Sequence, residues 1–179
     1  TAQDAFGNLA TSFNDSVTLS DTAPGATFGA VSFSGGLATV SATLETAGLQ
    51  VITATDTAPS TTVGNASTGA IVVAPGALAS FIVTAAPASV SAGNSTTVSF
   101  TAEDAFGNVE VGYTGPVDLS STDAAATFGT PSIVAGFGAA SVSLFTAGNQ
   151  TVTVTDQATH LAGTSNTINV VGSTTSSDA

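Results

Sequence analysis

The charged side chains of this sequence are almost all carboxylates. Twelve Asp and Glu residues occur with no Lys, no Arg and a single His, which gives a formal net charge of −12. Without a cationic side chain nearby, clustered carboxylates are stabilised by turn N–H groups, by water or by a metal ion. Hard cations such as Ca²⁺ take carboxylate and carbonyl oxygens as ligands. A calcium site is therefore the first chemistry to consider.

Four aspartates are the candidate calcium ligands. Asp104 and Asp156 each follow an alternating apolar segment with the parity of its inward-facing residues, and Asp4 and Asp56 repeat the arrangement a hundred residues earlier. If these segments are strands of a sandwich, both carboxylates of a pair reach the same end of a domain. The alternative is that each aspartate simply caps its own turn, since no Asp-x-Asp-x-Asp loop accompanies them. Both interpretations stay open, and no other cofactor is expected.

The residues for catalysis are sparse. His160 is the only histidine, and no Gly-x-Ser-x-Gly elbow or other nucleophile loop is present beside it. Glu103 and Glu110 flank a predicted turn, but a glycosidase needs two carboxylates placed across a cleft. We therefore predict that the chain is not an enzyme and has no catalytic residues.

Four Asn-x-Ser/Thr sequons are candidate N-glycosylation sites. They begin at Asn14, Asn65, Asn94 and Asn149. Because roughly a third of the residues are Ser or Thr, about two or three such sequons arise by chance, so the signal is weak.

Composition excludes several classes of partner. A chain without Lys or Arg cannot neutralise phosphates, so nucleic acids and anionic lipid surfaces are not expected ligands. No run approaches eighteen apolar residues, so we do not expect insertion into a membrane. The hydrophobic fraction of 42% with only 7% charged residues is typical of a folded chain rather than a disordered acidic one. With no Cys, there is no disulfide framework.

The sequence contains a tandem repeat with a period of one hundred residues. Thr-Ala-Gln-Asp-Ala-Phe-Gly-Asn at 1–8 recurs as Thr-Ala-Glu-Asp-Ala-Phe-Gly-Asn at 101–108, and roughly half of the paired positions between 1–56 and 101–156 are identical. The register slips only after Asp56. Repeats of this length indicate two copies of one structural module.

Within each copy the apolar residues alternate with a period of two. Val152 and Val154 alternate with threonines. Apolar and polar residues also alternate in the segments around 98–102, 117–119, 140–144 and 168–170. Strict alternation indicates strands with one buried and one exposed face. About seven short strands per hundred residues predict an all-β fold: two tandem immunoglobulin-like antiparallel β-sandwiches.

The two copies differ in completeness. We expect repeat 1 at residues 1–74, a linker at 75–76, a complete repeat 2 at 77–172 and a flexible tail at 173–179. Repeat 1 has no counterparts of Phe81, Val83, Val98 and Phe100, and burying each such side chain is worth about 1.5–3 kcal/mol. We therefore expect repeat 1 to lack its N-terminal strands and not to fold alone. Either a preceding segment or a neighbouring subunit then completes it by strand addition.

The Asp-Ala-Phe-Gly-Asn segment is expected to form a structural turn. Asp accepts the backbone N–H two residues ahead, Gly supplies a positive φ, and Asn tolerates the left-handed region. The phenylalanine is expected to tuck under the turn as a core plug. The residues concerned are Asp4, Phe6, Gly7 and Asn8 in repeat 1, and Asp104, Phe106, Gly107 and Asn108 in repeat 2.

These motifs carry a resemblance to a known family. Asp-Ala-Phe-Gly-Asn, then Val-x-Leu-Ser, then Thr-Ala-Gly-x-Gln-x-(Val/Ile)-Thr resembles the bacterial immunoglobulin-like repeat of the invasin and intimin type, over nearly the whole chain. The resemblance implies an exported spacer module of a large prokaryotic surface protein.

The resulting functional hypothesis is an extracellular structural repeat of a cell-surface adhesin or surface filament. Its expected partners are adjacent immunoglobulin-like repeats or identical subunits. The alternative is a binding module that recognises a glycan, a host protein or ice. It would use loops at one end of the domain, such as Thr159–Ala162, or the threonine faces that include Thr153 and Thr155.

Overall fold

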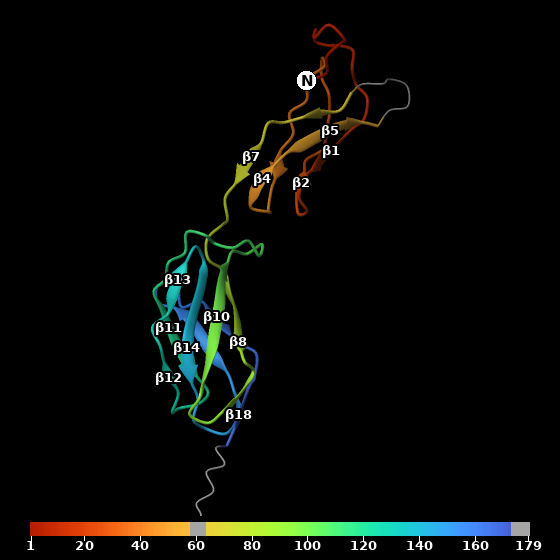
Figure 1. Cartoon of the computed structure of the whole chain (residues 1–179). Helices are drawn as coiled ribbons and strands as arrows, with labels where there is room; N and C mark the ends of the chain where they lie inside the picture. The colour runs from red at the N-terminus through yellow and green to blue at the C-terminus, as the bar shows by residue number, and fades with distance from the viewer. Residues whose placement is uncertain (58–63, 173–179) are drawn as a thin grey trace, which may run out of the picture. The chain divides into compact units, whose positions relative to one another are not determined.

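The chain folds into two compact units made of strands. The computed structural model describes residues 1–57 and 64–172 (Figure 1). The units are Thr1–Ala74 and Pro75–Ala179. The described residues form strands, turns and irregular segments, and no helix occurs among them. The predicted all-β class is confirmed.

The second unit contains three sheets. The largest has the strand order β12-β14-β10-β8, with β13 also paired to β14. Its strands are β8 (Ser80–Ala86), β10 (Ser95–Glu103), β12 (Thr127–Phe128), β13 (Ser132–Val134) and β14 (Phe137–Ser143). The opposing layer consists of β11-β16-β17 and β15-β18-β9. Its strands are β9 (Ser89–Ser91), β11 (Val117–Ser121), β15 (Gly148–Gln150), β16 (Val152–Asp156), β17 (Ala162–Thr164) and β18 (Ile168–Val171).

One strand pair departs from the predicted antiparallel sandwich. β9 runs parallel to β18, with Val90 opposite Val170, whereas the other described pairs are antiparallel. The alternation of apolar residues predicts which face of a strand is buried, but it does not predict whether the strand runs parallel or antiparallel to its neighbour. The buried positions are the same in either direction.

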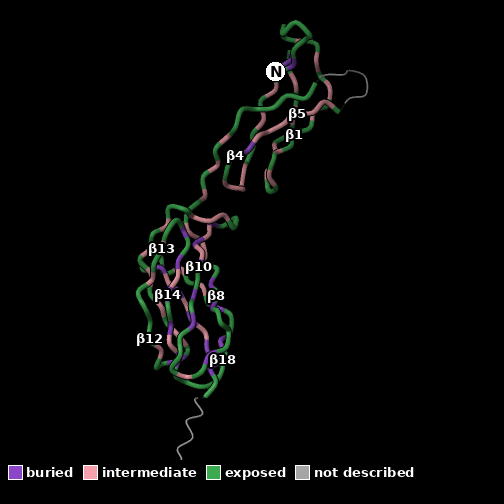
Figure 2. The backbone as a smooth tube through the Cα atoms, viewed as in Figure 1, coloured by how far each residue is buried: buried purple, intermediate pink, exposed green. Residues whose placement is uncertain are grey.

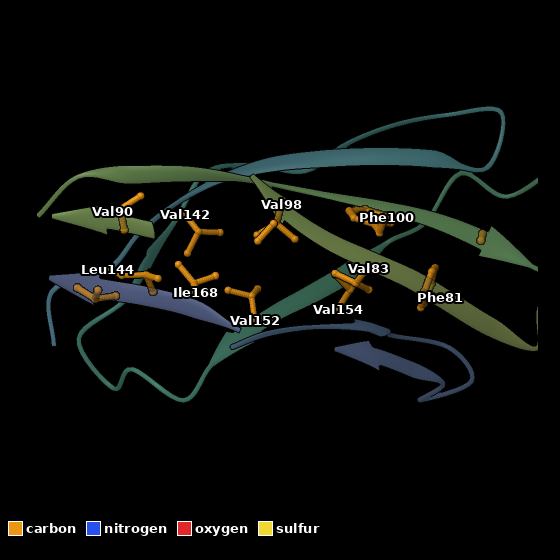
Figure 3. Packing of buried hydrophobic residues seen from close by; sticks show 13 residues of the cluster. Phe81, Val83, Val90, Val98, Phe100, Val142, Leu144, Val152, Val154 and Ile168 are labelled. Carbon is orange, nitrogen blue, oxygen red and sulfur yellow. The ribbon is translucent and has the colours of Figure 1, made fainter. Parts of the chain in front are cut away.

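Side chains from both layers interdigitate to form the core of the second unit (Figure 3). Burial alternates strictly along β10 and β16, as the period of two predicts. Val98, Val142, Leu144, Val152 and Val154 are completely buried.

A close contact with Gly138 positions the Phe100 ring. A Cβ atom built on Gly138 lies 2.1 Å from the ring of Phe100, so only glycine leaves room for this aromatic side chain on the neighbouring strand. The same ring meets Phe81 edge-to-face, with centroids 5.8 Å apart.

The first unit has shorter strands. β1 pairs with β5 in a three-stranded sheet that β6 completes, while β2 pairs with β3 and β4 with β7. The strands are β1 (Val17–Asp21), β2 (Thr27–Phe28), β3 (Ala42–Thr43), β4 (Gly48–Gln50), β5 (Ile52–Asp56), β6 (Ala66–Ser67) and β7 (Ile71–Val73). The register of β1 on β5 repeats that of β11 on β16 a hundred residues later.

The apolar face of the first unit is only partly covered. Among its described residues, Ala2 is the one buried apolar side chain, whereas the second unit has fourteen. Figure 2 shows this contrast as buried segments that concentrate in the second unit. Leu44 is half-buried, but its counterpart Leu144 is fully buried. No strand among the described residues of the first unit takes the place that β8 has beside β10.

Candidate functional site

The Asp-Ala-Phe-Gly-Asn segment forms the same hydrogen-bonded turn in both units. In the second unit, Asp104 Oδ1 accepts the backbone N–H groups of Phe106 and Asn108, and its Oδ2 accepts the Asn108 side-chain amide. Gly107 has a φ of 81°, which glycine adopts without strain. Asp4 makes the corresponding three hydrogen bonds in the first unit.

Two details of the predicted turn are wrong. Phe6 is 90% exposed and Phe106 is 60% exposed, so neither ring is a core plug. In the second unit the turn follows Glu103, the last residue of β10, so Phe106 lies outside the strand's alternation of buried and exposed positions. Asn8 and Asn108 do not adopt a positive φ either. Their role is to donate the side-chain hydrogen bond to the aspartate.

Asp104 has one partner that Asp4 does not share. Its Oδ2 also accepts the backbone N–H of Gly76, at 2.8 Å, which ties the beginning of the second unit to the turn. The Asn108 side chain and the Gly76 N–H, in that order, hold the pKa of the Asp104 carboxyl well below its ordinary value. The pKa of Asp4 is lowered as well, chiefly by Asn8.

Asp156 is buried at the end of β16 and belongs to a separate cluster. Its Oδ1 accepts the Tyr113 hydroxyl at 2.7 Å, and its Oδ2 accepts the backbone N–H and the hydroxyl of Thr159. The Tyr113 hydrogen bond is the main cause of a lowered pKa at Asp156. Burial, followed by the hydrogen bond to Asp156 and then by the Asp156 charge, raises the pKa of Tyr113. Sequence reasoning placed Asp156 at this end of the domain but missed Tyr113 as its partner.

The structure gives the four predicted calcium ligands other partners. Asp104 and Asp156 have separate sets of hydrogen-bond donors, and Asp4 is exposed in its own turn. Asp56 is half-buried at the end of β5. Across residues 1–57 and 64–172, no group of three or more His, Asp or Glu side chains is placed to hold a metal ion. Calcium binding by these residues stays a prediction.

A third buried carboxylate, Asp123, was missed by sequence reasoning. It accepts the backbone N–H groups of Ala125, Phe145 and Thr146 and the Thr146 hydroxyl. These donors lower its pKa. Repeat 1 has Ala23 at this position. This difference between the repeats, an acidic residue in place of alanine, is the feature of the sequence that could have indicated a role for Asp123. The cluster joins two loops of the second unit.

The remaining candidate positions lie on the surface. Asn14, Asn65, Asn94 and Asn149 are all exposed, so each sequon asparagine is accessible on its unit. Thr153 and Thr164 hydrogen-bond to each other through their hydroxyls, at 3.0 Å, which engages part of the threonine face internally. His160 has a φ of 60° and an exposed side chain in the loop that follows β16.

The first unit contains an apolar groove with a cavity volume of about 120 Å³. Phe13, Val17, Phe33 and Ala54 line it, and the first residue of the chain, Thr1, also lies against it. Phe13 and Phe33 meet edge-to-face within the lining, with centroids 4.8 Å apart.

The fold of the chain is similar to that of domains of known bacterial surface proteins. No protein-family model matches the chain, and no curated protein sequence does. Among solved structures, the Escherichia coli adhesin FdeC is similar over 95% of this chain, with 26% identity and a TM-score of 0.51. The D00-D0 domain of intimin is similar over 88% of this chain and 85% of its own length, with 14% identity and a TM-score of 0.50. The fold is the immunoglobulin-like fold of these domains.

The similar structures differ in how much of their own length this chain covers and in their TM-scores. This chain covers 56% of the FdeC structure, so it spans about half the length of that protein chain. Domains 4 and 5 of the S-layer protein SbsC match over 95% of this chain at 19% identity, but the TM-score of 0.40 is too low to support an argument. The predicted resemblance to the invasin and intimin type is confirmed at the level of fold. No helix long and apolar enough to cross a membrane occurs in the described ranges.

Proposed function

We propose that the chain is an extracellular spacer segment of a prokaryotic cell-surface protein, with a structural rather than a catalytic role. The observation that carries this proposal is the similarity to the adhesin FdeC over 95% of the chain. The internal repeat supports it, because spacer regions are built by repeating one module.

The carboxylate clusters fit a structural role. Asp104, Asp123 and Asp156 each connect loops or turns within the second unit through N–H and O–H donors. Every buried side-chain N or O atom of the described residues has a hydrogen-bond partner. A catalytic or ligand-binding carboxylate needs an oxygen that is accessible to its substrate, whereas Asp104, Asp123 and Asp156 are only 4%, 2% and 3% exposed.

The proposal is tested by measuring how the maximum dimension of the protein depends on the number of tandem copies of the chain. Proteins with one, two and three tandem copies of residues 1–172 are compared by small-angle X-ray scattering. A spacer predicts a maximum dimension that increases by a constant increment per copy. A matched series with a long Gly-Ser segment inserted after Ala74 serves as a flexible control, because such linkers behave as coils. A maximum dimension that does not increase with copy number contradicts the proposal.

The second candidate function is recognition of a glycan or a host protein by the Thr159–Ala162 loop. The left-handed backbone of the exposed His160 distinguishes this loop. A glycan array probed with the whole chain, and with His160→Gly as the matched variant, separates the two functions. Glycan binding by the whole chain that is lost in His160→Gly favours a recognition module. If the chain binds no glycan on the array, the spacer role is favoured.

A further inference from the structure

The second unit shows what covers the face that is open in the first. There, β8 and the first part of β10 place Phe81, Val83, Val98 and Phe100 over the sheet formed by β11, β16 and β17. The Phe81 ring lies 5.4 Å from the ring of Tyr113. Phe13 is the counterpart of Tyr113, and it lines the open groove of the first unit. The internal repeat therefore identifies the kind of segment that fits this groove.

A polar contact points to the same segment. Asp104 Oδ2 accepts the N–H of Gly76, which lies just ahead of β8, whereas Asp4 Oδ2 accepts only the Asn8 amide among the described residues. The Ala79 N–H likewise donates to the Glu103 carbonyl, at the position that Gln3 has in the first unit. A β8-type segment over the first unit therefore supplies donors to Asp4 and to Gln3.

We propose that the groove of the first unit binds an extended β-segment with the apolar alternation of residues 76–100, supplied by chain directly ahead of Thr1. This inference deepens the proposed function, on which it rests, because it makes each module depend on the segment before it. The register follows from the second unit, where Ser80 pairs with Glu103 and Phe81 with Ala102. The equivalents of Ser80 and Phe81 then pair with Gln3 and Ala2.

Two observations favour this occupant over a second copy of the chain. Thr1 lies against the groove, so residues joined to it enter the groove without a long connection. A second copy has β8 buried in its own core, where Phe81 is 5% and Val83 is 7% exposed. Donating β8 to another molecule opens that core, and each side chain lost from it costs about 1.5–3 kcal/mol.

The occupant is not an identical copy of residues 76–100. Gly138, which makes room for Phe100, is replaced by Ala38 in the first unit. Gly163, whose added Cβ lies 2.3 Å from the Phe81 carbonyl oxygen, corresponds in register to Ala66. A phenylalanine just ahead of Thr1 would therefore meet the Ala38 side chain, and a strand placed as β8 is would meet the Ala66 side chain.

The test joins a copy of residues 75–100 directly ahead of Thr1 in the full chain. It is made in the unaltered chain and with Ala38→Gly and Ala66→Gly, which reproduce the space found in the second unit. The matched control has Phe81→Ser and Val83→Ser in the copied segment only. Hydrogen exchange of the β1 and β5 amides reports on the first unit, and the β11 and β16 amides are the internal reference.

We expect the copied segment to slow exchange of the β1 and β5 amides by roughly a hundredfold in the Ala38→Gly, Ala66→Gly chain, with a smaller effect in the unaltered chain. The serine control should exchange like the chain without the added segment. Equal exchange in the added-segment and serine-control proteins, in both backgrounds, overturns the proposal.

Sedimentation of the chain without the added segment tests the other occupant. A monomer with fast exchange of β1 and β5 supports the proposal. A concentration-dependent dimer that protects these amides identifies a second copy as the occupant and overturns it. Neither result depends on whether the tandem copies lengthen in scattering, so failure of the groove proposal and failure of the spacer proposal are distinguishable.

Discussion

The hydrogen bond between Tyr113 and Asp156 offers a sharp test of how the second unit is stabilised. Tyr113→Phe removes only the hydroxyl and keeps the ring beside Phe81. Asp156 is 3% exposed, and its Oδ1 accepts the Tyr113 hydroxyl, whereas the Thr159 donors bind Oδ2. The substitution therefore leaves a buried carboxylate oxygen without its donor.

The expected loss is about 1.5–3 kcal/mol, the usual value for a hydrogen bond to a charged group. For a domain of this size, such a loss lowers the melting temperature by on the order of 10 °C. Differential scanning calorimetry of the full chain measures it in the transition of the second unit. Phe13→Tyr is the matched control, because it adds a hydroxyl at the counterpart position and should leave the second unit's transition unchanged.

The pH dependence identifies the cause. The raised pKa of Tyr113 means that its stabilising effect is present below about pH 10 and is lost as the pH rises through the raised pKa. The lowered pKa of Asp156 means that its effect is present above about pH 4 and is lost as the pH falls. Tyr113 is the only tyrosine, and Lys and Cys are absent, so the alkaline loss should disappear in Tyr113→Phe. A variant that melts like the parent, or that keeps the alkaline loss, refutes the reasoning.

Three further predictions concern other contacts of the second unit and the calcium ligands. Asp123→Ala should lower the melting temperature of the second unit, because four N–H and O–H donors lose their acceptor. Ala23→Asp, at the counterpart position in the first unit, is the comparison. An unchanged melting temperature in Asp123→Ala would contradict this role. Gly138→Ala should destabilise the second unit by about 1–3 kcal/mol in urea titrations, because its Cβ overlaps the Phe100 ring, whereas Ala38→Gly should not affect that unit. If calcium binds at Asp104 and Asp156, added Ca²⁺ should raise the melting temperature and a chelator should reverse the rise; identical melting curves reject the site.

Much of the fold was predictable because the apolar alternation is strict and the repeat supplies it twice. The segment from Val152 to Asp156 is an example, since its burial follows the predicted parity at each residue. The parallel pairing of β9 with β18 was not predictable. β9 is three residues long, and the direction of so short a strand depends on which neighbour it meets in the folded unit.

The candidate site was predictable where partners are close in sequence. The hydrogen bonds that Asp104 accepts from the Phe106 and Asn108 N–H groups span two and four residues, so turn chemistry alone indicates them. The hydrogen bonds that Asp156 accepts from Tyr113 and Asp123 accepts from Phe145 span 43 and 22 residues. Such pairs depend on strand register, which local patterns do not specify. The exposed Phe106 shows the opposite error, because an aromatic residue was taken to be buried on the basis of its type.

The way in which this chain stabilises its buried carboxylates predicts how its melting temperature depends on salt concentration. Asp104, Asp123 and Asp156 are each stabilised by neutral N–H and O–H donors, and the chain has no Lys or Arg. Salt therefore has few attractive charge pairs to screen, but it does screen repulsion among carboxylates that total −12. The melting temperature of the second unit should stay constant or rise between about 10 mM and about 0.5 M NaCl, over which the Debye length falls from roughly 30 Å to a few Å. A melting temperature that falls with salt shows that attractive ion pairs stabilise the second unit, and this account of the buried aspartates is then wrong.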